Sequence, residues 1–292
     1  MEEPTVYEIG IEQFFQTARE RYHIMLRRNQ GKPFPWTEDS IFQDWFFCNV
    51  RREDDKTTYW FKKNIRDHVE GLKAIEACII FRWFNRISTG EIIKDLLVED
   101  RWDHDEVKLL LEDVRPIVTG AYMIKTTTGL NKLDGILETV DETLPQLPQL
   151  TSSWGNSLEE AWKDLKVIPY MGPFMAYEVI SDLRWTSVLS KAKDIMTWAN
   201  PGPGCHRGIQ RIVFGENWRG QLSRNNPDDK TYMLEVMTEL LENSNSSKFW
   251  PKEWPAWEMR EVEHWLCEFD KYKRVEEGNR MKRRFRYKAA RK

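Results

Sequence analysis

The sequence lacks clustered cysteines and long apolar runs, and each absence removes a class of protein. Its four cysteines (Cys48, Cys78, Cys205 and Cys267) stand apart without a Cys-x-x-Cys pair. This spacing predicts neither a zinc ribbon nor a disulfide scaffold. No stretch reaches the roughly 18 uninterrupted apolar residues of a membrane span. The acidic start has neither the basic residues nor the apolar core of a signal peptide. We expect a soluble, cytoplasmic protein with free thiols and no contact with a membrane.

An excess of basic residues is also missing, because 44 Lys and Arg stand against 47 Asp and Glu. Basic residues gather at the end instead, where residues 280–292 contain eight of them and no acid. Such a tail can contact DNA phosphates, although a solvated end is the alternative. With 14 Trp and 14 Phe, the chain has ample material for a packed core, which excludes a disordered protein.

Apolar residues recur at helical spacing along most of the chain, and no region is rich in strands. Residues 118–128 are the best candidate for a short hairpin. Residues 141–153, with two prolines and paired serines, are predicted to form a linker or a crossing loop. Thr37 is expected to cap the helix that follows it. The predicted fold is all-α, with helices at residues 11–28, 37–47, 71–84, 90–97, 105–112, 131–139, 157–165, 232–243 and 255–273, and another that ends at residue 183.

The segment Leu165-Lys166-Val167-Ile168-Pro169-Tyr170-Met171-Gly172-Pro173-Phe174-Met175-Ala176 predicts two helices joined by a tight turn. Unpaired backbone N–H groups at the start of the second helix would bind a phosphate oxygen, helped by the helix dipole. An ordinary helical hairpin without a ligand is the alternative interpretation.

This segment resembles the helix-hairpin-helix of the base-excision DNA glycosylases. The resemblance implies that Pro169, Tyr170, Gly172 and Phe174 contact DNA. Tyr170 replaces the first hairpin glycine, which should change the backbone shape there. Phe174 stands where glycosylases with lyase activity carry a lysine, so strand cleavage through a Schiff base is not expected. The essential aspartate of that superfamily lies some twenty residues beyond the hairpin, and Asp194 lies 22 residues beyond Gly172. A helix N-cap is the alternative role of Asp194, and the two roles are compatible.

A loop rich in Pro and Gly follows at Asn200-Pro201-Gly202-Pro203-Gly204-Cys205-His206-Arg207-Gly208. We expect neither helix nor strand in this loop. Its glycines would let the backbone approach a ligand closely, and Arg207 could hold an anion.

Several stretches together resemble a narrower family, the α-glutamyl/putrescinyl-thymine pyrophosphorylases or amino acid:DNA transferases of thymine hypermodification. That family is related to the helical domain of 5-hydroxymethyluracil DNA kinases. The resemblance covers residues 14–275. It is carried by Pro33-Phe34-Pro35-Trp36-Thr37, Phe47-Cys48-Asn49-Val50-Arg51-Arg52-Glu53-Asp54, Phe81-Arg82-Trp83-Phe84-Asn85, the loop at 200–208, and Val262-Glu263-His264-Trp265-Leu266-Cys267-Glu268-Phe269-Asp270-Lys271-Tyr272.

The resemblance implies an enzyme of phage or fungal type that acts on double-stranded DNA after a 5-hydroxymethyluracil DNA kinase. The enzyme would act in the host cytoplasm if its source is a phage. It would replace the phosphate or pyrophosphate of a 5-phosphomethyl-type deoxyuridine with a free amino acid, glycine or glutamate being candidates, joined through nitrogen. The chain has no P-loop of its own, so it is not expected to be the kinase. No metal ligands are assigned, no cofactor is certain, and the metal requirement stays open.

The chemistry needs a nucleobase flipped out of the duplex, a positive charge that stabilises the leaving group, and a proton acceptor for the amine. We assign Asp194, Glu263, Asp270 and Lys271 to catalysis. Substrate and phosphate binding are assigned to Arg51, Arg52, Arg82, Asn85, Asn200, Gly202, Gly204, Arg207 and Glu268. Glu263, Cys267 and Asp270 share one helical face, for which solvated surface is the alternative.

The resemblance to glycosylases implies two helical lobes followed by a basic tail at 276–292. The first lobe comprises residues 1–140, with an N-terminus that could pack across the other lobe, and the second comprises residues 141–275 with the helix-hairpin-helix. Arg51, Arg82, Asp194 and Asn200 are expected to line a cleft between them. A monofunctional DNA glycosylase and a non-catalytic DNA-binding module remain the alternative functions.

Overall fold

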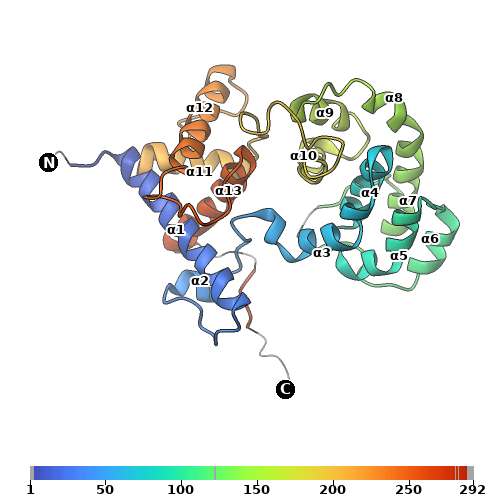
Figure 1. Ribbon diagram of the computed structural model, residues 1–292, viewed down its shortest axis with the longest axis horizontal. Helices are drawn as coiled ribbons and strands as arrows, with labels where there is room; N and C mark the ends of the chain where they lie inside the picture. Colours follow the sequence, from blue (N-terminus) through green and yellow to red (C-terminus); the bar gives the residue numbers. More distant parts are fainter. Residues whose placement is uncertain (1–2, 122, 280, 282, 288–292) are drawn as a thin grey trace. The chain divides into compact units, whose positions relative to one another are not determined.

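The computed structural model describes residues 3–121, 123–279, 281 and 283–287, and the regular secondary structure of these residues is helical (Figure 1). Their only β-type pairing is an isolated antiparallel bridge between Trp45 and Arg284. No helix among them is long and apolar enough to cross a membrane. The all-α prediction is therefore confirmed.

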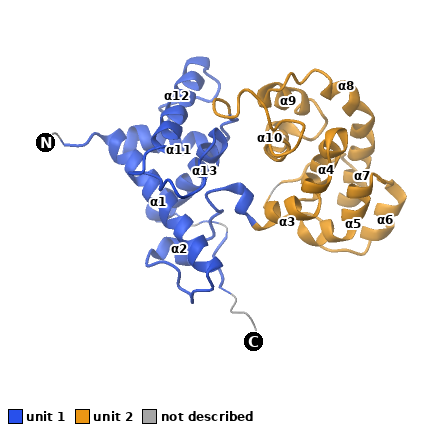
Figure 2. Ribbon diagram, in the orientation of Figure 1, with its two compact units in different colours: residues 1–55, 199–292 blue, residues 56–198 orange. Residues whose placement is uncertain are grey.

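The chain divides into two compact units, shown in different colours in Figure 2. Unit 1 combines residues 1–55 with residues 199–292, and unit 2 comprises residues 56–198. The boundaries suggested by the sequence, at residues 140 and 275, fall inside helices of unit 2 and unit 1 respectively.

Unit 1 is built around α13, against which α11, α12 and α1 pack. Its core is aromatic: Phe14, Trp265 and Phe269 are fully buried, and the Trp265 indole donates to the Phe14 carbonyl at 3.2 Å. Its helices are α1 (Val6–Asn29), α2 (Ser40–Asp44), η1 (Arg52–Asp54), α11 (Pro203–Phe214), η4 (Gly215–Asn217), α12 (Pro227–Asn243) and α13 (Met259–Glu276).

Unit 2 surrounds α4, whose residues from Ala77 to Phe84 are all buried. Helix α10 packs against α4 and also against α9. The helices are α3 (Lys56–Asn64), η2 (Arg66–His68), α4 (Gly71–Phe84), α5 (Ile87–Glu99), α6 (His104–Leu111), α7 (Lys132–Thr143), η3 (Leu144–Gln146), α8 (Leu147–Thr151), α9 (Leu158–Leu165) and α10 (Gly172–Leu183).

The helices expected from periodicity are present, with ends that differ by a few residues in most cases, and Ser157 caps α9 as expected. Three local predictions are wrong. Residues 141–153 are largely helical, because Pro145 and Pro148 lie in the first turns of η3 and α8, where a missing N–H costs little. Asp39, not Thr37, caps the next helix: it accepts from the amides of Ile41 and Phe42, whereas Thr37 accepts from the Asp39 amide.

The third wrong prediction is the hairpin at 118–128, whose described residues form no strand. This tract instead lies against α7. There the Lys132 ammonium donates to the Ile124 carbonyl at 2.7 Å, and Thr126 packs against Gly135.

The basic tail lies partly outside the described residues. Within them, the amide of Phe285 donates to the Asp44 carbonyl at 2.8 Å, and the amide of Phe46 donates to the Arg283 carbonyl. Tyr287 stacks on Phe34, with ring centroids 4.9 Å apart. Residues 283–287 therefore pack on the α2 region of unit 1.

Candidate functional site

A tight loop at residues 47–55 forms the first part of the candidate site in unit 1. The Asn49 side chain donates to the Asp54 carbonyl at 2.6 Å, and the Asn49 amide donates to Oδ1 of Asp55 at 2.8 Å. The Arg21 guanidinium of α1 donates to the Phe47 carbonyl at 3.3 Å. These bonds close the loop on itself and hold it against α1.

One face of α13 meets this loop directly. Glu268 accepts from the Cys48 amide at 2.9 Å and from the Lys271 ammonium at 2.5 Å. One turn earlier, Nε2 of His264 lies 3.1 Å from the Asn49 carbonyl and 3.8 Å from Oδ2 of Asp55. The loop at 47–55 and the motif at 262–272 are therefore parts of one structure.

The start of α11 forms the third part of the site. The segment 200–208 is not all loop as expected, because Gly202 is the N-cap and the helix begins at Pro203. Proline is favourable at the first helical position, which has no use for its missing N–H. A Cβ at Gly208 would lie 2.3 Å from the Leu266 carbonyl, and one at Gly204 would lie 3.1 Å from Sγ of Cys267. Gly204 and Gly208 thus let α11 pack closely on α13, whereas a Cβ at Gly202 would meet only Oε1 of Glu263, at 3.9 Å.

The ionisable groups of the loop and α13 are electrostatically coupled. Burial favours the neutral form of Glu268, but Lys271, His264 and the Cys48 amide together hold its pKa below the usual value. Burial disfavours the charged form of Lys271 and so lowers its pKa. The attraction of Glu268 and Cys48 is larger than this effect, and the pKa of Lys271 is raised. Burial raises the pKa of Asp55 to about 6, against the lowering effects of the Asn49 amide and Arg21. The site therefore holds a charged Lys–Glu pair beside a carboxyl whose pKa burial raises to about 6.

Asp270 lies on a different face of α13 and is completely buried. Its Oδ2 accepts from Arg207 at 2.9 Å and its Oδ1 accepts from Arg211 at 3.0 Å. Arg274 lies 3.4 Å away. With both oxygens engaged, Asp270 is placed to fix the arginines of α11. The Arg207 side chain is about one-third exposed, so it can face solvent from that anchor.

The other residues proposed for this half of the site also lie in unit 1. The side chain of Glu263, on α13, is buried, and its Oε1 lies 3.5 Å from Sγ of Cys267. Arg52 is buried in η1. Arg51 and Asn200 are half-buried.

Arg82 and Asn85, expected to bind a phosphate, lie in the core of unit 2. Arg82 is 1% exposed and donates to both oxygens of Asp182, at 2.5 and 2.7 Å, and to Asn85 at 2.8 Å. Arg66 lies 3.7 Å from the same aspartate. These contacts give Arg82 a structural role, because breaking a buried ion pair is costly.

Asp194, also in unit 2, has the geometry of a helix cap. Its Oδ1 accepts from the Leu158 amide at 2.8 Å, and its Oδ2 accepts from the Glu159 amide at 3.0 Å and the Ser157 hydroxyl at 2.8 Å. It therefore satisfies the first N–H groups of α9 from outside that helix, whose own N-cap is Ser157. The alternative role as an N-cap is met only in this wider sense.

The α9–α10 hairpin of unit 2 presents a mostly exposed turn. Pro169, Tyr170 and Phe174 are exposed, and a side chain at Gly172 would meet open space. Helix α10 begins at Gly172, as a phosphate-binding turn requires. Tyr170 has a φ of 63°, in the region that favours glycine, so replacing glycine by tyrosine has not excluded that conformation.

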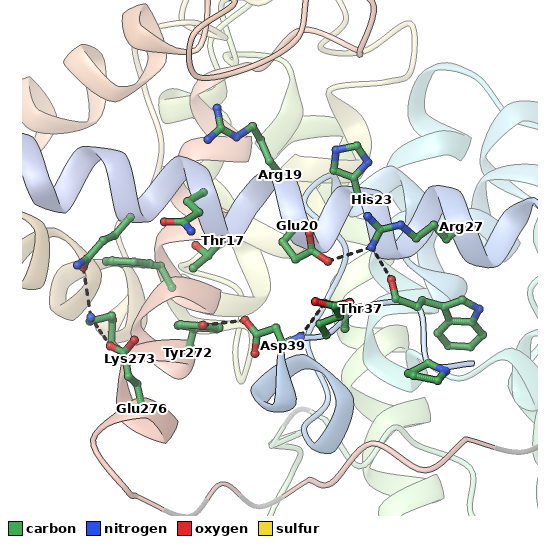
Figure 3. A pocket seen from close by; sticks show the side chains of 16 residues that line it. Thr17, Arg19, Glu20, His23, Arg27, Thr37, Asp39, Tyr272, Lys273 and Glu276 are labelled. Carbon is green, nitrogen blue, oxygen red and sulfur yellow. Dashed lines mark hydrogen bonds and ion pairs between the residues drawn. The ribbon is translucent and has the colours of Figure 1, made fainter. Parts of the chain in front are cut away.

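A separate pocket of about 890 Å³ lies in unit 1 between α1, residues 35–39 and the end of α13 (Figure 3). Its charged groups are largely paired with one another: Tyr272 donates to Asp39 at 2.8 Å, and Arg27 donates to Glu20 at 3.0 Å and to the Trp36 carbonyl at 2.6 Å. Such a mixed lining does not present the uniform positive charge that a DNA backbone attracts.

Sequence reasoning missed Asp55 and gave no role to Cys48 or His264. Asp55 directly follows the motif at 47–54, and His264 lies inside the motif at 262–272, so both were close to a recognised signal. What the sequence could not show is that the two motifs touch.

Comparison with known proteins gives the site a context. Residues 8–282 match the family described as the helical domain of 5-hmdU DNA kinase. A 5-hmdU DNA kinase of Bacillus phage SP10 is 30% identical over 291 residues, which cover 89% of this chain and 44% of that protein. The chain thus spans less than half the length of this curated relative. No solved structure matches the chain significantly.

Proposed function

The chain belongs to the family of the 5-hmdU DNA kinase helical domain, and from this premise we propose that it modifies bases derived from 5-hmdU in DNA. The proposed reaction replaces the phosphate or pyrophosphate on the exocyclic methylene with an amino acid joined through nitrogen. The chain would then act after a kinase has phosphorylated the hydroxymethyl group.

The contact between three distant motifs is the observation that carries this proposal. The loop at 47–55 is bonded to α13 through Glu268 and His264, and α11 packs on α13 through Gly204 and Gly208. Buried and half-buried acids, bases and thiols gather there. A module that only binds DNA has no need of buried carboxylates on such a face.

The proposed step is a substitution at carbon. The lone pair of a neutral amine forms the C–N bond, the C–O bond breaks, and the leaving phosphate takes its electron pair. The amine must lose a proton, for which we propose Glu263 as the acceptor. Arg51 and Arg207 would stabilise the charge on the departing phosphate.

Two further groups would orient the reactants. Lys271, which is about one-third exposed, is placed to attract the carboxylate of the amino acid. Asp270 would act through Arg207, which it anchors at 2.9 Å. The exposed hairpin turn at Gly172 would bind the DNA backbone, as its position at the start of α10 allows.

The product of the reaction tests the proposal. The protein is incubated with double-stranded DNA that contains 5-phosphomethyl-deoxyuridine and with a mixture of amino acids, and the nucleosides are then analysed by mass. We expect free phosphate and a nucleoside that is heavier than 5-hydroxymethyl-deoxyuridine by one amino-acid residue, with no adduct on unmodified DNA. Free base with an abasic site would identify a glycosylase and overturn the proposal. DNA binding without any product would overturn it in favour of a binding module.

A further inference from the structure

Three side chains with different metal-binding atoms converge where the 47–55 loop meets α13. One ligand atom each of Cys48, Asp55 and His264 lies within 4.8 Å of the other two. All three residues are half-buried, so solvent and ions can reach them. Cys48 and Asp55 come from the loop, whereas His264 comes from a helix more than 200 residues later.

We propose that Cys48, Asp55 and His264 bind one divalent transition-metal ion of the zinc class. A thiolate, an imidazole and a carboxylate form a mixed S, N, O donor set, which suits zinc and disfavours magnesium or calcium. Three protein ligands leave a fourth tetrahedral position open, as in sites where zinc also binds water or a substrate oxygen.

The surrounding bonds orient two of the ligands. The Asn49 amide holds Oδ1 of Asp55 at 2.8 Å, and Oδ2 is the oxygen on the His264 side, 3.8 Å from Nε2. Nε2 also lies 3.1 Å from the Asn49 carbonyl, so coordination through Nε2 would replace this hydrogen bond. The Cys48 amide is fixed by Glu268 at 2.9 Å, which anchors the backbone that carries the thiol. Hydrogen bonds of this kind around a metal's ligands typically tune its affinity.

Coordination requires the three ligand atoms to move closer to one another. Zinc bonds of about 2.0–2.3 Å in a tetrahedron place ligand atoms roughly 3.5 Å apart. Atoms that lie up to 4.8 Å apart must therefore move closer by up to about 1.3 Å. Binding would release the thiol proton of Cys48. The nearby charges are mixed, since Glu268 and Asp55 are acidic whereas Lys271 and Arg21 are basic.

Zinc titration of the full chain tests this proposal without any DNA or amino acid. The protein is stripped with a chelator, and zinc is then added in competition with a chromophoric chelator. We expect one tightly bound equivalent. Cobalt should give the intense visible bands of a tetrahedral site and a thiolate-to-metal band in the near ultraviolet.

Conservative variants locate the site. C48S and H264Q should each weaken zinc binding at least about tenfold, and C48S should abolish the thiolate band. The matched control is C78A, which removes a buried cysteine of unit 2 and should leave the affinity unchanged. Circular dichroism shows whether each variant is folded, and D55N replaces any that is not.

Zinc that stays bound equally well in folded C48S and H264Q, or no stoichiometric binding to the wild type, would overturn the metal site. This outcome is independent of the proposed transferase reaction. A chain that transfers an amino acid without binding zinc contradicts the metal site alone, and a chain that binds zinc without transfer contradicts the reaction alone.

Discussion

The backbone amide of Cys48 donates to the carboxylate of Glu268 at 2.9 Å, across 220 residues of sequence. The other oxygen of Glu268 accepts from Lys271 at 2.5 Å. Glu268 therefore joins the 47–55 loop to α13 and keeps Lys271 in place. Most of the proposed chemistry lies around this junction.

Replacing Glu268 should separate its two roles. E268Q keeps an oxygen for the Cys48 amide but loses the ion pair with Lys271, whereas E268A loses both. We expect E268A to destabilise unit 1 by about 1 kcal/mol or more, because it leaves the part-buried Cys48 amide without its acceptor. E268Q should cost less stability and still impair transfer. Tryptophan fluorescence during urea unfolding measures the difference, and equal losses in the two variants would contradict these roles.

Close packing of α11 on α13 should make Gly208 intolerant of any side chain. In G208A the new Cβ would meet the Leu266 carbonyl at 2.3 Å, so the helices must separate. Overpacking of this kind typically costs about 1–3 kcal/mol. G120A is the matched control, because its Cβ would meet open space. Thermal unfolding of both variants checks this prediction, and a G208A protein as stable as G120A would refute it.

The hairpin turn should bind DNA through Gly172. G172A places a methyl group on the turn and should weaken binding to duplex DNA, most clearly at low salt, where phosphate contacts contribute most. G71A is the control, because Gly71 also begins a helix of unit 2, with a φ of 56° against 58° at Gly172 and open space around its Cβ. The backbone strain is then similar in the variant and its control. Fluorescence anisotropy at several salt concentrations should show a loss for G172A only. An equal loss for both would attribute the effect to strain.

Asp194 should stabilise unit 2 by capping α9. D194A removes the acceptor of three hydrogen bonds and should cost about 1–2 kcal/mol, the usual value of a lost cap. At a temperature where the variant is folded, we expect transfer to continue. Loss of transfer by folded D194A would instead support the catalytic role that the resemblance to glycosylases implied.

His206 should make the stability of unit 1 depend on pH. Burial lowers its pKa below 6.5, with Arg224 and Arg207 adding to the effect against the Leu222 carbonyl, which accepts from Nε2 at 3.0 Å. The unfolded chain then binds the proton more readily than the folded one. The stabilisation is complete above about pH 6.5 and is lost as the pH falls below that value.

The variant H206Q tests this dependence, because an amide can still donate to the Leu222 carbonyl but does not titrate. Urea midpoints measured between about pH 7.5 and 5 should fall less steeply for H206Q than for the wild type. Parallel curves would show that His206 does not contribute.

Helix positions could be predicted because they depend on local periodicity, and α4 begins and ends where its apolar run does. The sequence was a poor guide where contacts between distant residues determine the structure. Two glycines of the segment at 200–208 indicated a ligand loop, yet they permit the packing of α11 on α13. For Arg82, which was predicted to bind a phosphate, the sequence could not show the buried ion pair with Asp182, 100 residues away.

Only part of the candidate site could be predicted from the sequence. Glu263, Glu268, Asp270 and Lys271 share a motif, so their presence could be noted, but one helix cannot reveal which face meets a partner. Asp270 and Glu268 differ by two residues, and one anchors arginines of α11 while the other holds the 47–55 loop. Only the fold distinguishes these roles.

The fate of a labelled phosphate tests the central claim most directly. Duplex DNA carrying 5-phosphomethyl-deoxyuridine with ³²P in its phosphomethyl group is incubated with the protein and ¹⁵N-labelled glycine and glutamate. The account predicts one phosphate released for each ¹⁵N atom joined to the nucleoside, with every glycosidic bond intact. Phosphate that stays on the base, or leaves on a free base without ¹⁵N incorporation, would contradict it.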